Sequence, residues 1–107
     1  MHDARIKATV VVAPAAGYAF TAAGLATVAA TVQLWEADDD RIVPNRWSAE
    51  NIEASLPSPP QLRLVPSADH FAFIAPCSAA LAERVPEICQ DPPGFDRPPF
   101  IVTSTPR

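Results

Sequence analysis

The sequence predicts an α/β fold that is built on a three-stranded parallel sheet with crossover helices. Residues 6–13 form a nearly continuous apolar and β-branched run, which is typical of a parallel strand covered on both faces. Strand-like segments follow at 31–37 and 61–65, and a stretch with helical character separates each strand from the one before it. Strands that alternate with helices favour right-handed crossovers and an open sheet with helices on its faces.

The helices are expected between and after these strands. A short helix is predicted at 22–28, and a longer one at 45–56. The last helix is predicted at 78–89, where Pro86 indicates a kink or an early end. Residues 91–107 are rich in proline, so we expect an irregular tail there.

The composition excludes two classes of partner. A chain of 107 residues is enough for one modest domain. Its formal net charge of -4 argues against nucleic-acid binding, because phosphate recognition needs clustered lysine and arginine. No apolar run approaches the roughly 20 residues of a membrane-spanning helix. We therefore expect neither a nucleic-acid partner nor a membrane span.

The first strand begins within a few residues of Met1, without the layout of a signal peptide. We therefore expect residues 1–107 to be part of a larger domain whose N-terminal part is absent from this sequence. The lack of a signal peptide favours the cytoplasm.

The chain has two cysteines, Cys77 and Cys89. They form no CxxC pair and have no nearby histidine, so we expect no metal site. Two interpretations stay open: a pair of buried thiols, or a disulfide that closes the short loop between them. A disulfide requires an oxidising compartment, and would indicate a periplasmic or secreted parent protein.

Polar side chains follow two neighbouring strands of the predicted sheet. Asp40 comes shortly after the strand at 31–37, and His70 follows the strand at 61–65. The carboxyl ends of adjacent parallel strands meet at one edge of the sheet, where catalytic groups gather in open α/β folds. We therefore expect the carboxylate to contact one imidazole nitrogen and fix the tautomer, so that the other nitrogen can act as a base.

A simpler interpretation exists for each residue. His70 can be an ordinary loop histidine, and Asp40 a turn or capping residue in a solvated acidic run. Asp69 directly precedes the histidine and can compete for its imidazole. The hypothesis of an acid–histidine pair therefore requires that Asp40 contacts the ring, rather than Asp38, Asp39 or Asp69.

Two stretches carry a resemblance to a known family. One runs from Val32 through the acidic loop to Pro44, and the other from Val65 to Phe71. Further likeness lies in the segments 70–77, 86–89 and 91–97. With these residues the chain resembles the closing section of α/β-hydrolases, over about residues 3–100. More narrowly, it is similar to the predicted dienelactone hydrolase branch of bacterial enzymes.

The resemblance implies a fold and a chemistry. The sheet would be equivalent to the C-terminal third of an α/β-hydrolase sheet. The reaction would be hydrolysis of a carboxylic ester or lactone through a covalent acyl intermediate, without a cofactor. Asp40 would be the triad acid and His70 the general base. Phe71 and Phe73, beside the histidine, are the residues expected to line a substrate pocket.

The sequence lacks the nucleophile that the resemblance implies. A G-x-S-x-G turn needs glycines on both sides of the serine, and Gly17, Gly24 and Gly94 flank no serine or cysteine at that spacing. Other candidate nucleophiles do not follow a strand through such a turn: Ser48, Ser67, Cys77 and Ser78. We therefore expect an incomplete hydrolase that is inactive alone and needs the missing N-terminal part as its partner.

A second hypothesis belongs to a different class. An apolar first strand without an outer neighbour leaves an exposed sheet edge, and such edges pair readily with other chains. The protein would then be a non-catalytic interaction module in which Asp40 and His70 are incidental. The expected partner is a small ester or lactone under the first hypothesis and another polypeptide under the second.

Overall fold

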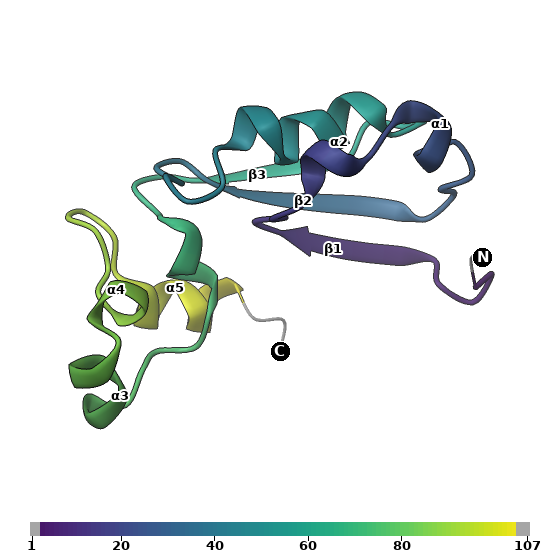
Figure 1. Ribbon diagram of the computed structural model, residues 1–107. Coiled ribbons are helices and arrows are strands. Elements are labelled where there is room, and N and C mark those ends of the chain that lie inside the picture. Colours follow the sequence, from purple (N-terminus) through teal and green to yellow (C-terminus); the bar gives the residue numbers. More distant parts are fainter. Residues whose placement is uncertain (1–2, 105–107) are drawn as a thin grey trace.

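A parallel sheet forms the centre of the fold in a computed structural model, which describes residues 3–104. Strands β1 (Ala8–Val12), β2 (Thr31–Ala37) and β3 (Gln61–Val65) pair in that order, and both pairs are parallel (Figure 1). The α/β class and the three-stranded parallel sheet that the sequence predicts are therefore confirmed.

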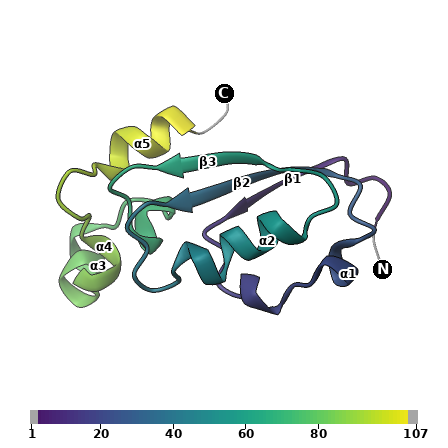
Figure 2. The same ribbon diagram turned by 90° about the horizontal axis from the view of Figure 1, so that it is seen from above.

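Helices cover one face of the sheet. Helices α1 (Ala22–Leu25) and α2 (Ala49–Ser55) lie on the same side of the strands (Figures 1 and 2). This covered face is the one that carries Val32 and Leu34 of β2. The buried apolar side chains between the strands and these helices form the first core: Leu25, Val32, Leu34, Ala49 and Ile52.

The opposite face, here called the open face, carries the alternate residues of the strands. Val10 and Val12 of β1 are 61% and 41% exposed on it. Near the carboxyl ends of the strands, helix α5 (Arg97–Ser104) brings Phe100 against Trp35, with ring centroids 6.2 Å apart. The prediction that the first strand is covered on both faces is therefore wrong for the described part of the chain.

The helices on the covered face are shorter than predicted. The first ends at Leu25, and the segment 45–56 begins with a 3-10 turn at Asn45–Trp47 before α2 starts. Ser48 separates the turn from the helix, because its backbone lies at φ -128° and ψ -83°. Its hydroxyl donates a hydrogen bond to the carbonyl oxygen of Pro14, which ties this break to the loop after β1.

The chain beyond β3 gathers at the carboxyl ends of the strands (Figure 1). It contains the 3-10 turn η3 (His70–Phe73) and helices α3 (Ala79–Arg84) and α4 (Pro86–Cys89). The helix predicted at 78–89 thus ends early, and Pro86 begins the next one, as expected for a residue that cannot continue a helix.

The two cysteines are bonded to each other. The Cα atoms of Cys77 and Cys89 are 5.7 Å apart, within the range of disulfides. The bond fits because the helix between them is interrupted at Pro86. Of the two interpretations left open by the sequence, the structure therefore has the disulfide, which ties the segment after η3 to the end of α4.

The sequence predicts an irregular C-terminal segment, but part of this segment is helical. Helix α5 spans Arg97–Ser104, and residues 105–107 lie outside the described part. The two prolines of this helix fall in its first turn, where a missing N–H costs little. The Arg97 side chain is 1% exposed, and its Nε donates to Oδ1 of Asp91 at 2.8 Å. This buried pair holds the start of α5 in place.

A second apolar core lies at the carboxyl end of the sheet. Its buried centre consists of small residues from β2, β3 and the turn after β3: Ala37, Val65, Ala68 and Ala72. Aromatic side chains pack around this centre: Trp35, Phe73, Phe95 and Phe100. The loops that follow β2 and β3 are therefore anchored on packed side chains.

Candidate functional site

Two backbone hydrogen bonds join the loop after β2 to the loop after β3. The N–H of Asp38 donates to the carbonyl oxygen of Val65 at 3.1 Å, and that of Asp39 to Ala68 at 2.9 Å. They extend the β2–β3 pairing beyond the strands. The next residues in each loop include Asp40 and His70, which are thereby brought side by side.

Asp40 is held by three polar contacts. Its side chain is 1% exposed, and Oδ1 accepts hydrogen bonds from the backbone N–H groups of Ile42 at 3.1 Å and Val43 at 2.7 Å. Oδ2 lies 2.8 Å from Nδ1 of His70. A buried carboxylate needs such partners, because an unpaired buried charge is costly. The predicted contact between the two side chains is present.

The rival carboxylates are engaged elsewhere. Oδ1 of Asp69 accepts the backbone N–H of Phe71 at 3.1 Å and so caps the η3 turn that carries the histidine. Asp39 pairs with Arg41 at 3.0 Å on the surface. Asp38 is exposed. The hypothesis that the imidazole pairs with one of these residues is therefore wrong.

The imidazole of His70 is oriented by Asp40. With the carboxylate ionised, Nδ1 carries the proton and donates it, an assignment that follows from the hydrogen-bond partner. The ring is bonded to Asp40 through this nitrogen, and the histidine side chain is 18% exposed. Nε2 is then left unprotonated, as a general base requires.

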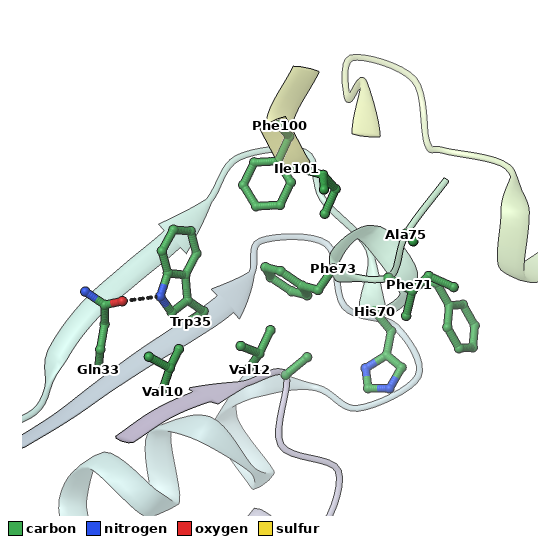
Figure 3. Close-up of a pocket in the computed structure, with 12 residues that line it drawn as sticks. Val10, Val12, Gln33, Trp35, His70, Phe71, Phe73, Ala75, Phe100 and Ile101 are labelled. Atoms are coloured by element: carbon green, nitrogen blue, oxygen red, sulfur yellow. Dashed lines mark hydrogen bonds between the residues drawn. The ribbon is translucent and has the colours of Figure 1, made fainter. Parts of the chain in front are cut away.

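An apolar hollow of about 680 Å³ lies between the open face of the sheet and the segment around η3 (Figure 3). We call it the apolar hollow; His70 lies at its rim. The residues that define it come from β1, β2, η3 and α5: Val10, Val12, Gln33, Trp35, His70, Phe71, Phe73, Phe100 and Ile101, with Ala13, Ile74 and Ala75.

The two phenylalanines predicted to line a pocket are placed differently. Both border the apolar hollow. Phe73 extends toward Val12 and Trp35, whereas the ring of Phe71 lies away from Trp35 (Figure 3). The ring of Phe71 packs edge-on against His70, with centroids 5.3 Å apart. Phe73 is thus part of the wall of the hollow, and Phe71 supports the imidazole.

A second, smaller hollow of about 270 Å³ also has His70 and Phe71 among the residues that border it. We call it the acidic hollow, because three carboxylates border it: Asp39, Asp69 and Glu87. Arg41 also borders it, and its Nε is bonded to Asp39. His70 therefore borders two hollows of different chemical character.

The candidate nucleophiles of the sequence are all occupied or apart from the site. Cys77 is in the disulfide, and Oγ of Ser78 accepts the N–H of Leu81 at 3.2 Å as the cap of α3. The hydroxyl of Ser48 donates a hydrogen bond to the carbonyl oxygen of Pro14, away from the Asp40–His70 pair. Ser67 has a left-handed backbone conformation, with φ 60°. It does not border either of the two hollows that His70 borders.

Apart from Phe71 and Phe73, sequence reasoning missed the residues that border the apolar hollow. It predicts an irregular tail at Phe100 and predicts no pocket role for Trp35. Strand alternation is the usable signal for Val10, Val12 and Trp35, because residues two apart share one face of a strand. No local pattern marks Phe100, which reaches the hollow through the long-range packing of α5.

The chain was compared with family models, curated proteins and solved structures, and none of the three comparisons finds a match. Within residues 3–104, no cluster of three His, Cys, Asp or Glu side chains is placed to hold a metal ion. The same part of the chain contains no helix with the length and hydrophobicity needed to cross a bilayer.

Proposed function

We propose that this chain supplies the acid and the general base of an ester or lactone hydrolase of the α/β-hydrolase type. The observation that carries the proposal is the contact of 2.8 Å between Oδ2 of Asp40 and Nδ1 of His70. The carboxylate is buried and fixed by two backbone N–H groups, so the imidazole is oriented before any substrate binds.

The topology is consistent with this family. The acid follows the second strand, and the histidine follows the third, at the same edge of a parallel sheet. This is the chain order of acid and histidine in α/β-hydrolases. On this proposal β1, β2 and β3 are equivalent to the last three strands of the hydrolase sheet, and the nucleophile belongs to a polypeptide segment outside this sequence.

The proposed reaction has two steps. Nε2 of His70 takes the proton of the nucleophile's hydroxyl group as that oxygen attacks the ester carbonyl, and then gives the proton to the departing alcohol. In the second step, Nε2 takes a proton from water, which attacks the acyl intermediate and releases the acid. Asp40 stays ionised and stabilises the imidazolium formed in each step.

Complementation tests the proposal. The chain is fused behind an N-terminal hydrolase part of the dienelactone hydrolase type that carries a G-x-S-x-G turn and lacks its own acid and histidine. We expect turnover of p-nitrophenyl butyrate by the fusion. Asp40→Ala or His70→Ala should lower kcat by roughly a thousandfold or more. Asp38→Asn, in the exposed part of the same loop, is the matched control and should retain kcat.

The isolated chain gives the complementary result. It should not hydrolyse p-nitrophenyl esters faster than its His70→Ala variant, because a base without a nucleophile provides little acyl transfer. Activity of the isolated chain that disappears in His70→Ala would show that a nucleophile lies within this sequence. Activity of the fusion that survives His70→Ala would refute the proposed role of the pair.

One observation favours a second candidate, the interaction module. Strand β1 pairs with β2 on one side, and its side chains Val10 and Val12 are exposed, as is Ile6 before it at 58%. An apolar edge of this kind can accept a strand from another chain. Under this alternative the Asp40–His70 contact is structural, and His70→Ala would leave partner binding unchanged.

A further inference from the structure

The loop 38–44, which leads from β2 toward α2, carries the buried carboxylate of the pair (Figure 2). Its first half is held by the two backbone hydrogen bonds to the segment after β3. Beyond Asp40 the loop gains little from burial, because the side chain of Arg41 is 83% exposed and Ile42 is 60% exposed. The position of this second half therefore depends on polar contacts.

Two sets of hydrogen bonds hold the second half of the loop. Oδ1 of Asp40 accepts the N–H groups of Ile42 and Val43, so the carboxylate and the loop fix each other. Nδ2 of Asn45 donates to the carbonyl oxygen of Ala37 at 2.8 Å. Ala37 is the last residue of β2 and is fully buried. The side chain of Asn45 thus joins the end of the loop to the point where the loop leaves the sheet.

Asn45 is itself fixed by contacts on the covered side. It begins the 3-10 turn η2 (Asn45–Trp47), and its carbonyl oxygen accepts the N–H of Ser48 at 3.0 Å. Ser48 is buried, and its hydroxyl accepts the N–H of Gly17 at 3.1 Å and donates to the carbonyl oxygen of Pro14. A Cβ at Gly17 would overlap the backbone of Ser48, so the two segments are in close contact. The amide of Asn45 is therefore presented by a turn that is anchored on a buried residue.

We infer that Asn45 is a positioning residue for the Asp40–His70 pair. It acts through the loop: the bond to Ala37 keeps the loop closed, so that Oδ1 of Asp40 retains its two backbone bonds and Oδ2 faces the ring. A carboxylate that turned away would leave the imidazole without the partner that selects its tautomer. The effect of Asn45 on hydrolysis rests on the proposed function, whereas its effect on the pair does not.

A second asparagine separates this role from general stabilisation. Nδ2 of Asn51, in α2, donates to the carbonyl oxygens of Gly17 at 2.8 Å and Phe20 at 3.0 Å. Asn51 thus forms bonds of the same kind with the loop after β1, which carries neither member of the pair. Leucine has nearly the shape of asparagine and lacks the donor, so Asn45→Leu and Asn51→Leu each remove such bonds without opening a cavity. Both variants should have a lower Tm.

The tautomer of His70 reports on the pair in the isolated chain. In a His2→Gln background His70 is the remaining histidine, and ¹⁵N NMR at pH 9, where imidazoles are neutral, distinguishes its two tautomers. We expect the proton on Nδ1 in this parent and in Asn51→Leu. In Asn45→Leu we expect a mixture of both tautomers. A proton held fully on Nδ1 in Asn45→Leu, or an equal change in Asn51→Leu, would overturn the inference.

The bond can also be measured in the unsubstituted chain, so the test does not depend on the folding of Asn45→Leu. The more protected side-chain amide proton of Asn45 should exchange with solvent roughly tenfold or more slowly than those of Gln90, which is exposed. Exchange at equal rates would show that the loop is open in solution, and would also overturn the inference.

The hydrolase fusion measures the consequence for catalysis. Asn45→Leu should lower kcat by roughly 10-fold to 100-fold with little change in KM, because it disturbs the base rather than substrate binding. Asn51→Leu should retain kcat. A raised KM with unchanged kcat in Asn45→Leu would contradict the positioning role. If the tautomers mix in Asn45→Leu but fusion activity survives His70→Ala, the proposed function fails while the positioning role of Asn45 stands.

Discussion

On the covered face of the sheet Leu34 is fully buried beneath the helices, whereas on the open face Val10 and Val12 stay 61% and 41% exposed. The two faces belong to the same strands, so strand propensity does not explain the contrast. The contrast arises from the connections between the strands: the crossovers return as α1 and α2 on one side, while α5 reaches the other side at the carboxyl ends. The acid–histidine pair is complete, but the surface beside it is not enclosed.

The largest expected effect comes from changing one side chain on each face. Leu34→Ala should lower the free energy of unfolding by about 2–5 kcal/mol, because it leaves a cavity in the first core. Val10→Ala should cost less than about 1 kcal/mol, because that side chain is mostly in water. Chemical denaturation of both variants measures this. If Val10→Ala lowered the free energy of unfolding as much as Leu34→Ala does, the open face would have to be covered in solution.

The disulfide comes next, because it ties the segment after η3 to the end of α4. The bond closes a loop with a sequence separation of 12, so its removal in Cys77→Ser/Cys89→Ser should cost about 2–4 kcal/mol. Thermal unfolding with and without reductant measures the loss. Thiol titration of denatured, unreduced protein is the control, and two free thiols would reject the bond.

A smaller effect is expected at the exposed edge. Val10→Lys should change the free energy of unfolding by less than about 0.5 kcal/mol, since the position is exposed. It should nevertheless reduce self-association, because a charge on an edge strand discourages pairing. Sedimentation of the parent chain and the variant at several concentrations decides this. A monodisperse parent chain would contradict the view that the open face and the outer edge of β1 are available for contacts with another chain.

The smallest effect concerns Glu36, near the end of β2. Burial, together with Glu50 and Glu53 of α2, raises the pKa of the Glu36 carboxyl. A raised pKa means that the folded state binds the proton more tightly, so stability falls as the pH rises above the ordinary value of about 4.5. Glu36→Gln should therefore raise Tm slightly at pH 7, and this gain should vanish below about pH 4. A gain in Tm that persists at pH 3 would show that the raised pKa of the Glu36 carboxyl is not its cause.

The amino-acid sequence was sufficient to predict those features of the fold and the site that local patterns determine. Apolar β-branched runs identified the strands, and the position of Asp40 and His70 after adjacent strands predicted their contact. The early end of the last predicted helix followed from Pro86. These features depend on neighbours in sequence or on the general geometry of parallel sheets.

The remaining parts depend on contacts that no local pattern reveals. Helix α5 forms in a proline-rich segment because the buried Arg97–Asp91 pair and the packing of Phe100 hold it. The break at Ser48 depends on its bond to Pro14, which is distant in sequence. The apolar hollow arises only when β1, η3 and α5 are brought together, so its walls could not be identified from spacing alone.

The most direct test of the central claim is the protonation of the two ring nitrogens of His70. In a His2→Gln variant labelled with ¹⁵N-histidine, NMR at pH 9, where imidazoles are neutral, reports which nitrogen carries the proton. We predict a proton on Nδ1 and none on Nε2. In Asp40→Asn, Oδ1 keeps the two backbone bonds, so the amide N–H₂ faces the ring and the proton should move to Nε2. A proton on Nε2 in the parent variant, or no change in Asp40→Asn, would contradict the account.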